Sequence, residues 1–192
     1  MKRVVLIGDS IRMGYQDGVR GALADVAEVW APAENGGTSK NVLANLEEWV
    51  LARSPAVVHL NCGLHDIKRN DGENGLLVPA SDYERNLRDI FGRIHAMKCT
   101  KLLWASTTPV NEERHHAQKA FDRFEADVQL YNDIALGVAR EYRAPVNDLY
   151  AAIAGAGRDE LLSEDGVHFT DAGYARLAQV VAGFIRSHLD TV

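Results

Sequence analysis

Short apolar runs alternate with longer amphipathic stretches along the whole of this 192-residue sequence. Such runs are typical of strands that are buried on both faces of a parallel sheet. The predicted strands are Arg3–Ile7, Glu28–Ala31, Ala56–Leu60, Lys101–Ala105 and Pro145–Asn147. This alternation predicts an α/β fold in which helices cover both faces of one sheet.

The stretches between and after the strands carry apolar residues at helical spacing. They predict helices within residues 42–50, 83–97, 121–142 and 177–185. Five strands with such connections favour a flavodoxin-like, doubly wound parallel sheet in a three-layer α/β/α arrangement. Analogy with that fold gives the strand order 2-1-3-4-5.

Composition excludes several classes of protein. The length predicts a single domain over residues 1–192, and the net charge of −6 argues against a nucleic-acid or anionic-membrane surface. The apolar run after Met1 is too short for a signal peptide, and no run could span a bilayer, so we expect a cytoplasmic protein. Cys62 and Cys99 have neither metal-site spacing nor the number needed for a disulfide framework.

Polar or glycine-rich segments follow every predicted strand. The first strand runs into the sequence GDSI, with Ser10 as its third residue. The segments after the other strands are residues 35–37, 63–66, 107–114 and 165–168. Because the carboxyl ends of parallel strands meet at one edge, where open sheets bind their ligands, we expect one site there.

Ser10, His168 and Asp165 have the residue types of a nucleophile, a base and the acid that orients the base. His168 would accept the Ser10 proton, and Asp165 would fix the imidazole tautomer. The alternative is structural: Ser10 would cap a helix, and Asp165 would begin a turn leading to a helix cap at Thr170. The motifs GxSxG and GxGxxG and the P-loop are absent, which disfavours an α/β-hydrolase elbow and common nucleotide sites.

The order of these blocks resembles that of the SGNH (GDSL) hydrolases over nearly the whole chain. The resemblance implies the SGNH hydrolase fold, a Ser-His-Asp triad and an acyl-serine intermediate, without a metal or organic cofactor. It also implies an oxyanion hole built from the N–H of Ser10, the N–H of Gly36 and a side chain at position 65. Gly37 is the alternative to Gly36.

This sequence departs from the family at His65, which stands where the family has asparagine in its GxND block. A neutral imidazole can donate an N–H to an oxyanion, although it is larger than an amide and titrates near neutrality. The alternative is that His65 only hydrogen-bonds a loop. We expect Asp66 to brace this block.

Other polar residues have weaker signals. We expect Asp9 to fix the turn before Ser10, and His59 to be a core histidine. The pair His115-His116 is expected to face solvent, and the loop Arg69–Ala80 could act as a lid. The residues that could contact substrate are Asp9, Gly37, Asn111, Glu112 and Arg114.

The sequence therefore predicts a serine esterase for a small-molecule ester, with short acyl groups such as O-acetyl esters of sugars favoured. Lipid esters, thioesters and acyl transfer are alternatives within the same chemistry. The alternatives from other classes are a catalytically weak SGNH-like ligand-binding domain and a flavodoxin-like binder of flavin or phosphate. No nucleic-acid or membrane partner is expected, and a homo-oligomer is left open.

Overall fold

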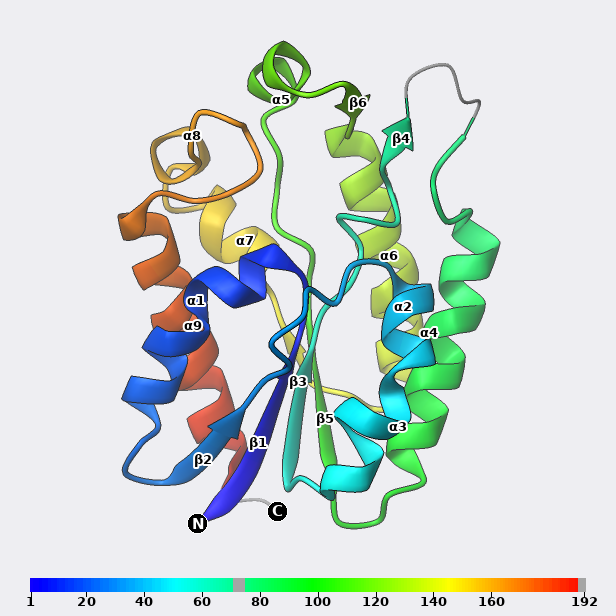
Figure 1. Ribbon diagram of the computed structural model, residues 1–192, viewed down its shortest axis with the longest axis vertical. Coiled ribbons are helices and arrows are strands. Elements are labelled where there is room, and N and C mark those ends of the chain that lie inside the picture. Colours follow the sequence, from blue (N-terminus) through cyan, green and yellow to red (C-terminus); the bar gives the residue numbers. More distant parts are fainter. Residues whose placement is uncertain (71–74, 190–192) are drawn as a thin grey trace.

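The computed structural model, which describes residues 1–70 and 75–189, is built around a five-stranded parallel sheet (Figure 1). Its strands are β1 (Lys2–Ile7), β2 (Ala27–Trp30), β3 (Val57–Leu60), β5 (Lys101–Ala105) and β7 (Val146–Asn147). They lie in the order β2-β1-β3-β5-β7, and all four pairings are parallel. This confirms the predicted order 2-1-3-4-5.

Helices cover both faces of the sheet, as predicted (Figure 1). One face carries α1 (Ser10–Ala22) and α9 (Asp171–Leu189), with α7 (Leu149–Ala154) against α9 and α8 (Arg158–Leu161) against α7. The other face carries α2 (Ser39–Ala44), α3 (Leu46–Trp49), α4 (Ala80–His95) and α6 (Glu125–Glu141). A 3-10 turn at Leu51–Arg53 leads into β3.

Because the sheet is covered on both faces, its central strands have no exposed side. Residues 4–7 of β1 and 57–60 of β3 are all buried, which explains their continuous apolar runs. His59 is the polar exception within β3. It is buried as predicted, and it takes part in a hydrogen bond between its Nε2 and Asn147 Nδ2, 3.1 Å apart.

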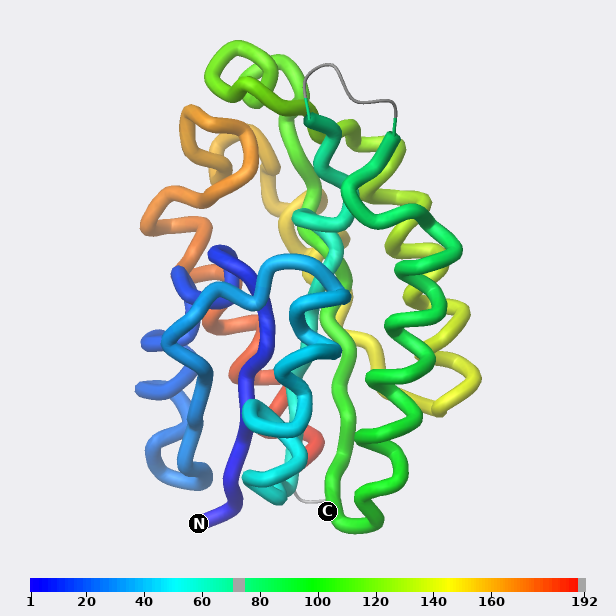
Figure 2. The backbone as a smooth tube through the Cα atoms, turned by 45° about the vertical axis from the view of Figure 1, so that its right-hand side comes forward, coloured from blue at the N-terminus to red at the C-terminus, as the bar shows by residue number. Residues whose placement is uncertain are grey.

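Three small elements extend beyond the carboxyl edge of the sheet, at the top of Figures 1 and 2. They are α5 (Glu112–Gln118) and the antiparallel pair β4 (Arg69–Asn70) and β6 (Phe121–Asp122). The residues predicted as a lid, Arg69–Ala80, include residues 71–74, which lie outside the described residues. The lid stays a prediction.

Two predicted helices differ from the structure. The helix predicted from residue 121 begins at Glu125, because Phe121 lies in β6 and the Phe124 backbone is extended. Both rings lie beneath cations, with Lys68 over Phe121 and Arg69 over Phe124, so their contacts are not those of a helix face. The helix predicted over residues 42–50 is broken at Asn45, whose side chain donates to the Asn41 carbonyl at 2.9 Å.

Within the described residues, no helix combines the length and apolarity needed to cross a bilayer. Both cysteines are free thiols: Cys62 is buried, and Cys99 is exposed. Neither is paired in a disulfide.

Candidate active site

Ser10 is the first residue of α1, directly beyond the end of β1. Asp9 is the N-cap of this helix, and its Oδ1 accepts the N–H of Ile11 at 2.9 Å. Asp9 therefore fixes the turn, as predicted. The Ser10 N–H belongs to the first turn of the helix, where backbone donors have no acceptor within the helix.

The fold brings His168 and Asp165 to Ser10 across almost the whole chain. The Ser10 Oγ lies 2.8 Å from His168 Nε2, and His168 Nδ1 lies 2.6 Å from Asp165 Oδ2. In Figure 2 the start of α1 and the segment before α9 approach each other at this edge of the sheet. The sequence-predicted nucleophile, base and orienting acid therefore form one chain of hydrogen bonds.

The second oxygen of Asp165 is held by three donors. Oδ1 accepts the Ser163 hydroxyl at 2.9 Å and the N–H groups of Val167 and His168 at 3.0 and 2.9 Å. Burial disfavours the charged carboxylate, but the hydrogen bonds from His168, Val167 and Ser163 outweigh it and hold the pKa of Asp165 well below its ordinary value. Asp165 is therefore an ionised acceptor at neutral pH.

The loop carrying Asp165 and His168 is supported from α5. Gly166 adopts a φ of +71°, and its carbonyl accepts the N–H of Asn111 at 2.8 Å. A Cβ at Gly166 would lie 2.4 Å from the Asn111 carbonyl oxygen. Only glycine fits both the backbone conformation and this close approach.

Ser10 and His168 open into a cavity of about 270 Å³, referred to below as the Ser10 cavity. Its lining residues are Asp9, Ser10, Asn35, Leu64, His65, Lys119, Phe121, Arg123, Asp165, Val167 and His168. Lys119, Phe121 and Arg123 were not among the predicted site residues. They lie in the segment between α5 and α6, part of which was predicted to be helical.

His65 lies on the wall of the Ser10 cavity. Burial lowers the pKa of His65, which favours the neutral ring with one N–H. In the described part of the chain, no hydrogen bond holds this ring. Asp66 braces the block, as predicted, since its buried carboxylate accepts the N–H and the hydroxyl of Ser39 at 2.9 and 2.5 Å.

The two glycines after β2 use their N–H groups within the protein. Gly36 donates to the Gly8 carbonyl at 3.0 Å, and Gly37 donates to Asn35 Oδ1 at 2.9 Å. A Cβ at Gly36 would lie 2.6 Å from the Gly8 oxygen, so this approach requires glycine. Either N–H would have to exchange its present acceptor in order to bind an oxyanion.

A model of the GDSL-like lipase/acylhydrolase family matches residues 6–176. The chain belongs to this family. It is an enzyme of the hydrolase class, with esterase or acylhydrolase activity. A comparison with curated proteins gave no match.

Several solved structures have the same fold as this chain. A lipase/acylhydrolase from Enterococcus faecalis has a TM-score of 0.82 at 25% identity, covering 98% of this chain and 97% of that one. An acetylxylan esterase from Geobacillus stearothermophilus has a TM-score of 0.75 at 21% identity, covering 96% and 93%. A further acetyl xylan esterase has a TM-score of 0.77 at 20% identity, covering 95% and 99%.

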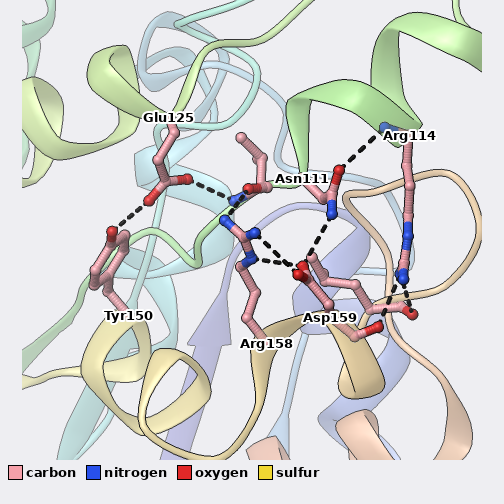
Figure 3. A network of polar contacts seen from close by, with 8 residues as sticks. Asn111, Arg114, Glu125, Tyr150, Arg158 and Asp159 are labelled. Carbon is pink, nitrogen blue, oxygen red and sulfur yellow. Dashed lines mark hydrogen bonds and ion pairs between the residues drawn. The ribbon is translucent and has the colours of Figure 1, made fainter.

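The predicted substrate contacts of the acylhydrolase at Asn111, Glu112 and Arg114 are not among the residues that line the Ser10 cavity. Asn111 and Arg114 instead join α5 to α8, with hydrogen bonds of 2.9 Å each to the side chain and the carbonyl of Asp159 (Figure 3). Glu112 accepts the N–H of Glu125 at 2.6 Å, at the start of α6. These groups are used to join elements, so the geometry does not support their predicted contacts with substrate.

The adjacent histidines do not both face solvent. His115 is buried, because it packs edge-on against Phe121 and its Nδ1 lies 3.3 Å from the Asp165 carbonyl. His116 is exposed, and its Nε2 lies 3.3 Å from an oxygen of Asp122. Residues 1–70 and 75–189 contain no group of three or more His, Cys, Asp or Glu side chains that could hold a metal ion.

Proposed function

We propose that the acylhydrolase cleaves short-acyl esters of small molecules through an acyl-serine on Ser10, without a metal or organic cofactor. The observation that carries this proposal is the hydrogen-bond chain from Ser10 through His168 to Asp165 at the Ser10 cavity. The family membership supports ester chemistry, and the chain of contacts supports a serine mechanism.

In this mechanism, His168 Nε2 removes the Ser10 proton as Oγ attacks the ester carbonyl. The ionised Asp165 holds the N–H on Nδ1 and stabilises the imidazolium that forms. His168 then gives its proton to the departing alcohol, which leaves an acyl-serine. Water, deprotonated by His168, then attacks this ester, the bond from the acyl carbon to Ser10 Oγ breaks, and His168 returns the proton to Oγ as the acid is released.

The negative oxygen of the tetrahedral intermediate needs donors that are already in place. The Ser10 N–H and a neutral His65 N–H on the same cavity wall are the two donors we propose. Gly36 would become a third only by exchanging its hydrogen bond to Gly8.

The size of the Ser10 cavity favours small acyl groups over long lipid chains. Its wall carries several polar groups, which suits an alcohol with many hydroxyls. Two relatives of the same fold are acetylxylan esterases, and we propose O-acetyl esters, including those of carbohydrates, as the substrate class.

A fluorophosphonate probe tests the nucleophile. It should add one adduct per chain, on the peptide that contains Ser10, because only an activated serine reacts. Ser10→Ala should abolish labelling and lower kcat for p-nitrophenyl acetate by several orders of magnitude, whereas Ser187→Ala on exposed α9 surface should change neither. Labelling that persists in Ser10→Ala would refute the assignment.

An acyl series from acetate to octanoate tests the substrate class. We expect kcat/KM to be highest at the short end and to fall with chain length. A maximum at octanoate would favour a lipid or thioester acylhydrolase instead.

The second candidate is a catalytically weak ligand-binding domain. It is favoured by one observation, the Gly36 N–H that is bonded to Gly8 and not free for an oxyanion. Tight binding of acetylated sugars, with no labelling of Ser10 and no turnover, would establish this alternative.

A further inference from the structure

Arg123 is a buried cation beside the proposed nucleophile, and the mechanism above does not use it. The residue is 6% exposed and lies between β6 and α6, at the wall of the Ser10 cavity. Burial of a guanidinium is costly unless its N–H groups and its charge are matched. The partners of Arg123 therefore indicate what it is placed to bind.

One edge of the Arg123 guanidinium is fixed by the protein. Its Nε donates to the Leu64 carbonyl at 2.6 Å, next to His65, and its Cζ lies 5.0 Å from the centre of the Phe121 ring. These contacts hold the plane of the side chain. They leave the two terminal nitrogens without a hydrogen-bond partner in the described residues.

The acidic groups near Arg123 do not pair with it. Among the described residues, no carboxylate lies within ion-pair distance of its guanidinium. The Oδ1 of Asp9 accepts the Ile11 N–H and its Oδ2 is buried, while both oxygens of Asp165 are engaged by other donors. Lys119, which also lines the cavity, lies 3.8 Å from Asp165. Lys119 is therefore paired with Asp165, and among the described residues that line the cavity Arg123 is the cation without an ion pair.

We propose that Arg123 binds a carboxylate of the substrate, so that the enzyme prefers esters that carry an acidic group near the scissile bond. A guanidinium offers two parallel N–H donors that match the two oxygens of a carboxylate. This assignment deepens the proposed function and rests on it. The carboxylate could belong to the acyl group or to the alcohol, and the two sources are separable by experiment.

Two pairs of matched esters test the preference. The acyl pair is mono-p-nitrophenyl succinate against p-nitrophenyl butyrate, and the alcohol pair is 3-acetoxybenzoate against 3-acetoxybenzamide. The measured quantity is the ratio of kcat/KM for the acidic ester to that for the neutral one. We expect this ratio to exceed 1 in the pair whose carboxylate reaches Arg123.

Arg123→Met removes the charge and keeps an apolar stem, and it should lower that ratio by about 10- to 100-fold. Arg123→Lys keeps the charge without the two parallel donors, so it should recover the ratio only in part. Lys119→Met is the matched control, because it removes a cation from the same cavity. Its ratio should fall less than that of Arg123→Met if the guanidinium recognises the carboxylate directly.

Three outcomes would overturn the proposal. The ratio could be unaffected by Arg123→Met while both esters slow in parallel, which would make Arg123 an oxyanion donor. Arg123→Met and Lys119→Met could lower the ratio equally. That result would mean that the overall positive charge near the cavity attracts the acidic ester, and not a direct contact with Arg123. The wild-type enzyme could also show no preference in either pair.

A binding measurement separates this proposal from the proposed function. Calorimetry should show that Ser10→Ala binds 3-hydroxybenzoate or succinate more tightly than the corresponding neutral amide, and that adding Arg123→Met removes the difference. If no ester is hydrolysed but this preference is present, the proposed function fails and the carboxylate site stands. If esters are hydrolysed and neither acid is preferred over its amide, the carboxylate site fails.

Discussion

At the scale of single residues, the least usual member of the site is His65. If its N–H stabilises the oxyanion, His65→Ala should lower kcat by about 10²–10³-fold with little change in KM, because the bond strengthens mainly in the transition state. His65→Asn restores an amide donor and should recover part of the loss. Steady-state kinetics on p-nitrophenyl acetate measures both. If His65→Ala keeps a kcat close to that of the wild type, the oxyanion hole consists of backbone donors alone.

His59 should make the protein sensitive to acid. It is fully buried, and burial lowers the pKa of His59 to about 3. Below pH 6.5 the unfolded chain binds a proton at this residue that the folded chain does not, so stability falls as pH falls. This contribution is lost at about 1.4 kcal/mol per pH unit between pH 6 and 4.

His59→Gln tests that dependence, because it cannot titrate and keeps an acceptor for the Asn147 amide. Urea unfolding at several pH values should give a shallower acid slope for this variant than for the wild type. Identical slopes would mean that His59 is protonated in the folded protein, or that the unfolded chain does not bind the proton.

The sequence predicted the residues whose chemistry is recognisable from type and position. Ser10 could be proposed because it follows the first predicted strand, and Asp165 and His168 because they precede the last predicted helix and their residue types complement that of Ser10. Arg123 could not, because its neighbours Phe121 and Phe124 continue an apolar helical pattern. Its importance depends on burial and on a bond to Leu64, 59 positions away, and neither is visible in a single sequence.

At the scale of elements, the loop from Asp165 to His168 depends on Gly166. Gly166→Ala would force a Cβ against the Asn111 carbonyl and strain a positive φ, so the loop must move. We expect a loss of stability of about 1–3 kcal/mol, together with a fall in kcat because His168 shifts relative to Ser10. Thermal unfolding and steady-state kinetics measure the two effects.

Gly157→Ala is the control for that prediction. Gly157 also has a positive φ, of 91°, but its nearest neighbour would be the flexible Glu160 carboxylate at 3.3 Å. It should cost stability through backbone strain and leave kcat close to that of the wild type. Equal kcat values in the two variants would show that the loop position is not set by its contact with α5.

The strands were predictable to within a residue or two because both faces of the sheet are buried. The start of α6 was not, because it depends on tertiary contacts such as the cations stacked on Phe121 and Phe124. The break at Asn45 was not either, because the bond from its side chain to the Asn41 carbonyl leaves no mark on the apolar pattern. Hydrophobic periodicity shows which face of a helix is buried. It does not show where the helix begins, or that apolar residues before it line a cavity.

At the scale of the whole molecule, the site exists because the two ends of the chain pack together. Helix α1 begins at Ser10, α9 begins three residues after His168, and the two helices lie side by side in both views (Figures 1 and 2). The spacing of these helices therefore helps to set the contact between Ser10 and His168. Gly18 is a point of close approach, where an added Cβ would lie 2.7 Å from the Ala178 Cβ.

Gly18→Ala should therefore separate α1 from α9. In an open helix the same change would stabilise by up to about 1 kcal/mol, but here overpacking should destabilise by about 1–3 kcal/mol. Because Ser10 moves with α1 and His168 with α9, kcat should fall as well.

Gly21→Ala in the same helix is the control. Its added Cβ meets nothing within 4 Å, so it should stabilise the protein without loss of kcat. Urea unfolding gives the stability of both variants, and steady-state kinetics gives their kcat. If Gly18→Ala is as stable and as active as Gly21→Ala, the spacing of α1 and α9 does not set the contact between Ser10 and His168.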